Sequence, residues 1–246
     1  MKEPFFPTIW AEVIRTRTEH PGRRREAVNV VAQRYWKPVY SFLLWKYKDV
    51  HKAEDLTQGF FTEIVMGHDL LQGADPTRGK LRNLLLTALG HYVGGEYRRD
   101  TARSRQPPGG FVSLEGLEDR RLPEPVAGAT ADQAYLFTWA SSLIAETTRE
   151  VKEECLREGQ GLHWELFYAT VLLPIVEGAE PPSNAELRAK HGLATDQDVS
   201  NRSETVRRKY RRVLRAKVRG PNESQEDVDS EIAELMRICA EFRASS

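Results

Sequence analysis

Cysteine is scarce in this chain of 246 residues: it has two, Cys155 and Cys239, far apart in the sequence. Two cysteines are too few for a disulfide scaffold, and they lack the close spacing of zinc ligands, so neither kind of site is expected. Long apolar runs are also missing. The amino terminus, MKEPFFPTIW, has none of signal-peptide length, and no segment approaches the length of a membrane span. We therefore predict a protein of the reducing cytoplasm with no membrane partner.

Net charge is absent as well, because 36 basic residues balance 36 acidic residues. The charges are nevertheless unevenly distributed. Basic residues dominate 78–105 and, more strongly, 202–219, whereas acidic residues collect in 115–158 and 223–241. Two basic segments separated by acidic ones are typical of a DNA-binding protein with a linker that does not touch DNA. Ordinary solvated helix faces are the alternative interpretation.

Internal repeats and strand-type alternation are lacking, and apolar residues recur with helical spacing. We therefore predict an all-α protein with two helical domains joined by a flexible linker. The predicted boundaries are a first domain over 1–105, a linker over 106–130, a second domain over 131–220, and an acidic C-terminal tail with one amphipathic helix over 221–246. The linker is predicted from its lost periodicity and its prolines and glycines. Pro38 is expected to start or kink a helix.

A helix-turn-helix pattern lies near the C-terminal end. Ser183 and Glu186 have the spacing of a capping box, which would begin a helix over 184–191, and Gly192 would end it. A long basic helix is predicted to follow. The second helix of such a motif enters the major groove of DNA. Near its start, five side chains could reach base edges, and the later arginines suit phosphates: Ser200, Asn201, Arg202, Ser203 and Thr205. A plain helical hairpin with a charged exterior is the alternative.

The run HKAEDLTQGFF, at 51–61, is the most distinctive in the chain. On a helix, Asp55, Gln58 and Thr62 share one face. An acidic and amide face beside exposed aromatic surface indicates a docking site for a basic partner helix. His51 and Asp55 could both bind a metal ion, but no third ligand has suitable spacing, so no metal site is predicted. Helix capping by these acids is the other alternative.

The segment AEDLTQGFF, at 53–61, resembles region 2.2 of the extracytoplasmic-function (ECF) subfamily of the sigma-70 family. RYWKPVY at 34–40 resembles region 2.1 of a planctomycete-type branch, and DPTRGKLRNLL at 75–85 resembles its entry into region 2.3. FTWA at 137–140, together with the helix-turn-helix, resembles its region 4. The resemblance implies a bacterial RNA polymerase sigma factor, with a region 2 helical bundle and a region 4 helix-turn-helix domain. Such a protein binds core polymerase and directs promoter recognition and transcription initiation, without catalytic residues or a cofactor.

The resemblance also assigns residues. Glu54, Asp55 and Gln58 would bind the clamp of the largest polymerase subunit. In the first domain, the residues that would receive the melted minus-ten strand and the adjoining DNA are Arg78, Lys80, Arg82, Asn83, Tyr97, Arg98 and Arg99. In the second domain, the residues that would read and grip the minus-thirty-five element of promoter DNA are Arg202, Ser203, Arg207 and Arg208. Regulation by an anti-sigma factor, by phosphorylation or by the acidic tail stays open.

Three other functional classes remain open from the sequence. The first is a helix-turn-helix transcriptional regulator that binds DNA without polymerase. The second is an enzyme acting on nucleic acid, such as a nuclease, but the sequence has no convergent cluster of carboxylates or histidines. The third is a helical adaptor whose basic helix contacts an acidic protein. Salt dependence separates the DNA-binding classes from the adaptor, because contacts to phosphates release counterions.

Overall fold

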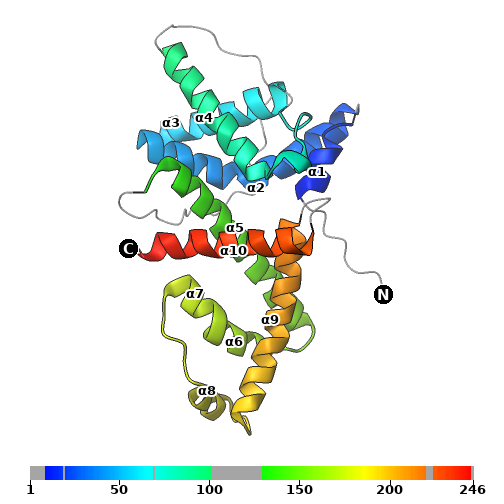
Figure 1. Ribbon diagram of the computed structural model, residues 1–246, viewed down its shortest axis with the longest axis vertical. Helices are drawn as coiled ribbons and strands as arrows, with labels where there is room; N and C mark the ends of the chain where they lie inside the picture. Colours follow the sequence, from blue (N-terminus) through cyan, green and yellow to red (C-terminus); the bar gives the residue numbers. More distant parts are fainter. Residues whose placement is uncertain (1–8, 19, 69, 101–128, 220–223, 245–246) are drawn as a thin grey trace. The chain divides into compact units, whose positions relative to one another are not determined.

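The computed structural model describes residues 9–18, 20–68, 70–100, 129–219 and 224–244, and it is drawn in Figure 1. All regular secondary structure in these ranges is helical, which confirms the all-α prediction. The helices are α1 (Ile9–Arg15), α2 (Pro21–Tyr47), α3 (Val50–Gly59), α4 (Leu81–Asp100), α5 (Ala131–Arg157), α6 (Gly161–Phe167), α7 (Leu173–Glu177), α8 (Asn184–His191), α9 (Asp196–Val218) and α10 (Gln225–Ala244). Two π-helical segments, η1 (Phe60–Gly67) and η3 (Tyr168–Leu172), and a 3₁₀ turn, η2 (Pro76–Arg78), complete the set.

The chain folds into two compact units. Unit 1 comprises Met1–Ser141 and Val218–Ser246, and unit 2 comprises Ser142–Lys217. This division differs from the predicted boundaries, because it passes through α5 and assigns α10 to unit 1 rather than to a separate tail. Of the predicted linker, 106–128 lie outside the described residues. The prediction of an amphipathic closing helix is confirmed by α10, whose buried side chains include Val228 and Leu235.

Helix α2, with 27 residues, packs against α1 and α3 in unit 1. It continues through Pro38, so this proline does not begin a helix. A proline in the first turn, Pro21, replaces an amide that would have no partner in the helix. The helix ends at Lys48, which has the left-handed φ of 55°. Asp49 then caps α3 by accepting a hydrogen bond from the Lys52 N–H at 3.0 Å.

Aromatic side chains fill the space between α2, η1 and α4. Phe60 and Phe61 are fully buried, with the Phe60 ring 5.8 Å from Tyr92 of α4 and the Phe61 ring 5.8 Å from Trp36 of α2. Gly59 precedes them, and a Cβ atom there would overlap the Tyr92 hydroxyl. Glycine at this position therefore permits the close approach of α4, which explains its place in the distinctive sequence motif.

In unit 2, α6, η3 and α7 follow one another without a break, and α6 and η3 pack against α9. The Phe167 ring lies 5.5 Å from the Tyr210 ring of α9. The Tyr210 hydroxyl also lies 3.3 Å from the Thr148 hydroxyl of α5. Helix α9 is strongly amphipathic, and its buried face consists of Val199, Ser203, Val206, Tyr210, Val213 and Leu214. The opposite faces are therefore available to carry the basic residues.

Candidate nucleic-acid interface

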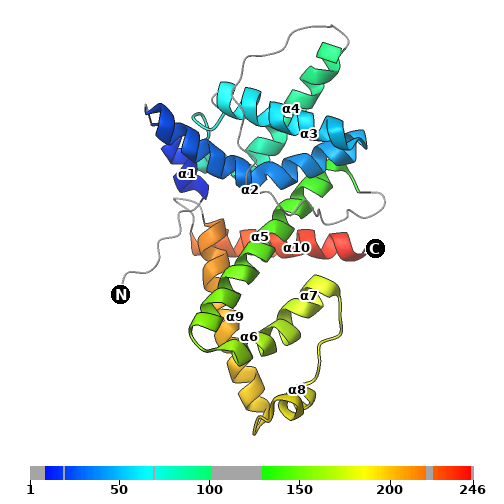
Figure 2. The ribbon, with the colours of Figure 1, turned by 180° about the vertical axis from the view of Figure 1, so that it is seen from behind.

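Helices α8 and α9 form a helix-turn-helix at one end of unit 2, where Figure 2 shows α8 beside the start of α9. The predicted capping box is present. The Ser183 hydroxyl accepts from the Glu186 N–H at 3.2 Å, and the Glu186 carboxylate accepts from the Ser183 N–H at 2.8 Å. These hydrogen bonds hold the pKa of Glu186 below its ordinary value. Gly192 ends α8 in the left-handed conformation, with φ of 65°, as predicted.

A second pair of reciprocal hydrogen bonds begins α9. The Asp198 carboxylate accepts from the Thr195 N–H at 2.9 Å, and the Thr195 hydroxyl accepts from the Asp198 N–H at 3.1 Å. The sequence analysis missed this cap, although the spacing of a hydroxyl and an acid three residues apart is visible in the sequence. The two caps fix both helix starts, so the turn of four residues between α8 and α9 has defined ends.

A small apolar cluster sets how α9 projects from unit 2. Leu166 of α6, Leu187 of α8 and Val199 of α9 are all buried against one another, and Leu193 from the turn packs on them. Beside this cluster, a cleft of about 390 Å³ lies along the first turns of α9. Its lining consists mostly of amide and hydroxyl side chains, among them Asn184, Gln197, Ser200 and Asn201. Such groups can donate and accept hydrogen bonds as base edges require.

The predicted base-contacting residues divide by their position around α9. Asn201 is exposed, and Arg202 and Thr205 are half-buried. Ser203 is only 5% exposed, and its hydroxyl lies 2.9 Å from the Thr170 hydroxyl of η3. The assignment of Ser203 as a DNA contact is therefore corrected. Four residues after the buried Val199, it falls on the inward face of the helix, and the helical phase decides against it.

The basic residues of α9 form two sets. The first faces α5, whose glutamates repeat every four residues along one side of that helix. Lys209 contacts both Glu158 and Glu154, and its hydrogen bond to Glu158 lowers the pKa of that carboxyl group. The further pairs in this set are Arg212 with Glu154 at 2.8 Å and Lys217 with Glu146 and Glu150 at 2.8 Å each. These charges bind α9 to α5, and Lys217 is only 8% exposed.

The second set turns away from α5. Arg208 and Arg211 are exposed, and 56% of the Arg211 side chain is accessible. Arg207 is half-buried and lies 3.5 Å from Glu204 within the same helix. An exposed ion pair of this kind contributes little to stability, so it does not hold Arg207 strongly. Arg211 lies 4.0 Å from the same Glu204 carboxylate. The exposed arginines that α9 directs away from α5 are thus Arg208 and Arg211.

The predicted polymerase-binding residues lie on α3. Asp55 is exposed, and Glu54 and Gln58 are half-buried. Asp55 and Gln58, three residues apart, lie on neighbouring positions of one helix face, while Ala53 and Thr57 are buried on the other side. The structure therefore leaves an acidic and amide surface on α3. The exposed aromatic surface expected beside it is wrong for Phe60 and Phe61, which are fully buried because they pack against α2 and α4. What binds this surface stays a prediction.

The loop before α4 carries the predicted Arg78, which is exposed. Asp75 shapes this loop by accepting hydrogen bonds from the Thr77 N–H at 2.9 Å and the Thr77 hydroxyl at 2.7 Å, and these bonds lower the pKa of the Asp75 carboxyl group. Gly79 has a φ of 140°, which only glycine adopts readily. Asn83, in the first turn of α4, is also exposed. Arg78 and Asn83 are thus placed where a ligand could reach them.

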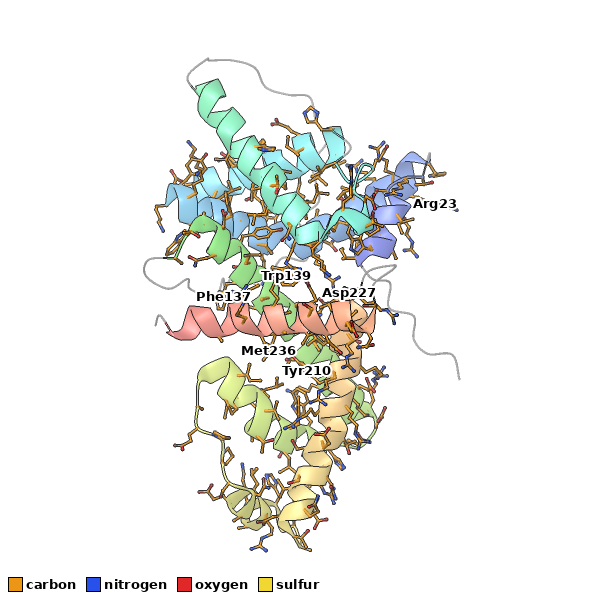
Figure 3. The ribbon with its side chains drawn as sticks, viewed as in Figure 1. Arg23, Phe137, Trp139, Tyr210, Asp227 and Met236 are labelled. Atoms are coloured by element: carbon orange, nitrogen blue, oxygen red, sulfur yellow. The ribbon has the colours of Figure 1, made fainter. Side chains whose placement is uncertain are left out.

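Arg82 does not fit its predicted role. Its side chain is 3% exposed, and its guanidinium pairs with Glu231 of α10 and with Glu234 at 2.8 Å. The guanidinium also lies 4.5 Å from the centre of the Trp139 ring of α5. Figure 3 labels Trp139 where α5 passes α10. The assignment of Arg82 as an exposed DNA contact is therefore corrected: an acidic helix distant in sequence covers it, which local sequence could not reveal.

Four other residues of unit 1 were predicted to contact DNA: Lys80, Tyr97, Arg98 and Arg99. Lys80 is 29% exposed, and its ammonium group lies 3.6 Å from the Glu231 carboxylate. Tyr97, Arg98 and Arg99 belong to α4, but their side chains lie outside the described residues. The basic character of the loop is thus shared between exposed Arg78 and two residues that face α10.

Two buried tyrosines, Tyr35 and Tyr135, lie in the interior near Arg82. Tyr135 donates a hydrogen bond to the Arg82 carbonyl oxygen at 3.1 Å. Burial raises the pKa of Tyr135 well above its ordinary value and that of Tyr35 to about 12. Both hydroxyls therefore stay protonated at neutral pH and act as fixed parts of this interior.

No group of three or more histidine, cysteine, aspartate or glutamate side chains within the described ranges is placed to hold a metal ion. None of the helices in those ranges is long and apolar enough to cross a membrane. In comparisons with known proteins, the chain matches no family model, no curated protein and no solved structure.

Proposed function

We propose that this chain is an RNA polymerase sigma factor of the extracytoplasmic-function kind, acting in the cytoplasm. In this role it binds core RNA polymerase and directs it to promoter DNA, and polymerase alone carries out the chemistry. The observation that carries the proposal is the division of charge on separate helices. An acidic and amide face on α3 accompanies a helix-turn-helix whose second helix directs arginines away from its packed face.

The geometry of unit 2 supports contact with duplex DNA. The first turns of α9 carry amide and hydroxyl groups around an open cleft, and Arg208 and Arg211 extend along the exposed side. A recognition helix contacts bases with its N-terminal residues, and arginines suit contacts with phosphates. The polar groups at the start of α9 and the later arginines follow this order along the helix. The acids of α5 neutralise only the basic residues that face them, so they do not cancel the outward positive charge.

The DNA part of the proposal is tested with two neighbouring residues of α9. Arg208→Ala removes an outward charge, whereas Lys209→Ala removes one already engaged by Glu154 and Glu158. Binding to a fluorescein-labelled mixed-sequence duplex is followed by anisotropy across a salt series. If Arg208 neutralises one phosphate, Arg208→Ala should reduce the slope of log K against log[salt] by about 0.9. Lys209→Ala should leave the slope unchanged, and equal effects of the two would contradict the assignment.

The polymerase part is tested by co-purification with core enzyme. Asp55→Ala combined with Gln58→Ala should reduce recovery of the chain with polymerase, because it removes the polar face of α3. The matched control is Glu26→Ala with Gln33→Ala, which replaces an exposed acid and an exposed amide on α2 of the same unit. Unchanged recovery of the α3 variant would remove the clamp assignment.

A transcriptional regulator that acts without polymerase is the second candidate, and the helix-turn-helix supports it equally. The two differ in what the isolated chain does. A regulator binds a specific duplex tightly on its own, whereas a sigma factor of this kind binds duplex weakly until polymerase is present. In vitro transcription with core enzyme and a promoter library separates them, because only a sigma factor makes initiation depend on the chain.

A further inference from the structure

Helix α10 begins with a strongly acidic half. Residues 225–234 include five acids and no base: Glu226, Asp227, Asp229, Glu231 and Glu234. The start of this helix is fixed by a reciprocal cap, in which the Asp227 carboxylate accepts from the Ser224 N–H at 2.9 Å and the Ser224 hydroxyl accepts from the Asp227 N–H at 3.2 Å. A capped and highly charged helix is thus held in unit 1 at the entry to α4.

Two kinds of contact hold α10 in place. Val228, Leu235 and Ile238 are buried on one face, each 4% exposed or less. On the same side, the Glu231 side chain is only 4% exposed and meets both Lys80 and Arg82. A carboxylate that is buried to this degree requires such partners, because desolvation of an unpaired charge is strongly unfavourable. The docked position of α10 therefore depends on these cations.

The same cations belong to the segment that resembles the DNA-facing entry of region 2.3. Carboxylates and phosphates both bind guanidinium groups through charge-assisted hydrogen bonds, so Glu231 and Glu234 occupy the position that phosphate oxygens would take on Arg82. One hydrogen-bond donor of Arg82 is also left without a partner, because its buried Nε–H has no acceptor. A buried donor without an acceptor raises the free energy of the docked state.

We propose that α10 is an autoinhibitory helix that competes with a nucleic-acid backbone for Lys80 and Arg82. This inference rests on the proposed function, because it takes the loop and start of α4 to be a nucleic-acid contact. In the closed state, α10 covers Arg82 and reduces the exposure of Lys80. In the open state, α10 leaves unit 1, and both side chains bind phosphates next to the exposed Arg78.

The first test changes charge and keeps shape in the full chain. Glu231→Gln with Glu234→Gln removes the two carboxylates that bind Arg82. The control, Glu226→Gln with Asp229→Asn, removes the same charge from exposed positions in the same half of α10. The probe is a fluorescein-labelled single-stranded DNA of mixed sequence, measured by anisotropy. The first variant should bind at least about fivefold more tightly than wild type, within the usual range of coupling between two sites.

The control variant should bind no more than about twofold more tightly, because only the general repulsion between acids and DNA changes, and salt screens it. Adding both Lys80→Gln and Arg82→Gln to the first variant should abolish its gain. Equal gains in the two charge variants, or a gain that survives the loss of both cations, would overturn the proposal, since α10 would then act only through net charge.

A second measurement reports the position of α10 without nucleic acid. Cys239 of α10 is 5% exposed, and in a Cys155→Ala background it is the only thiol. Its rate of reaction with a maleimide should rise several-fold in the Glu231→Gln, Glu234→Gln variant and not in the control. Saturating single-stranded DNA should also raise the rate in the protein with both glutamates intact.

The outcomes separate this inference from the proposed function. Faster labelling without tighter DNA binding would mean that α10 opens but does not cover a nucleic-acid contact, which overturns the inference. Unchanged labelling would mean that these ion pairs do not hold α10, which also overturns it. Failure of the chain to co-purify with core polymerase or to support initiation would instead contradict the proposed function, whatever α10 does.

Discussion

Replacing Arg82 by alanine should destabilise the packing of α10 far more than its place in a basic segment of the sequence suggests. The substitution removes the guanidinium that pairs with Glu231 and Glu234 and that covers the Trp139 ring. The Arg82 and Glu231 side chains are 3% and 4% exposed, so solvent cannot take the place of the lost partner. Breaking such a buried pair from one side costs about 3–5 kcal/mol.

Hydrogen exchange followed by mass spectrometry measures this loss locally, without assuming that the two units unfold together. At about 1.4 kcal/mol for each factor of ten, a loss of about 3 kcal/mol should speed exchange of slow amides in α10 by at least about a hundredfold. Arg78→Ala is the matched control. It removes an exposed guanidinium from the preceding loop and should change these rates by less than about threefold, as surface substitutions usually do.

The double variant Arg82→Ala, Glu231→Gln tests the stated cause. Because it removes the stranded charge as well as its partner, it should recover a substantial part of the lost protection. Exchange in α10 that is no faster after Arg82→Ala than after Arg78→Ala would refute the reasoning, because α10 would then be held by its apolar face alone.

Two further predictions concern other parts of the fold. Ser183→Ala should lower the free energy of unfolding of unit 2 by about 1 kcal/mol, because the α8 cap is lost, whereas Glu186→Gln keeps an acceptor and should change it little; urea denaturation compares them. Burial raises the pKa of Tyr35 from 10.0 to about 12, so the folded state favours the protonated phenol. This contribution to the free energy of unfolding of unit 1 is complete below pH 10, and it should be lost as the pH rises from 10 to about 12. Tyrosinate absorbance of wild type minus Tyr35→Phe checks it, and a difference titrating at the ordinary value would contradict it.

Much of the local structure followed from local sequence. The Ser183 capping box and the Gly192 helix end need only residues a few positions apart, and both were predicted at the correct places. The buried Phe60 and the exposed Asp55 follow from helical periodicity in the same way. Pro38 was expected to begin or kink a helix, and because α2 runs through it, only the helix start is excluded.

The partners of the charged residues could not be predicted. The glutamates of α5 are evenly spaced in the sequence, but nothing in that spacing says that Lys209 and Lys217 would lie opposite them. Ser203 is predicted to contact DNA from its place near the start of the second helix and from the resemblance, and only its contact with Thr170 of η3 shows that it faces inward.

Sequence by itself determined the all-helical class, the helix-turn-helix with its caps, and the existence of an amphipathic acidic closing helix, because each depends on interactions within a few turns of chain. Which charged side chains form ion pairs in the interior depends on the tertiary structure. Arg82 and Glu231 are 149 residues apart. Their pairing depends on how α4, α5 and α10 pack, and long-range packing leaves no signature in the spacing of one segment.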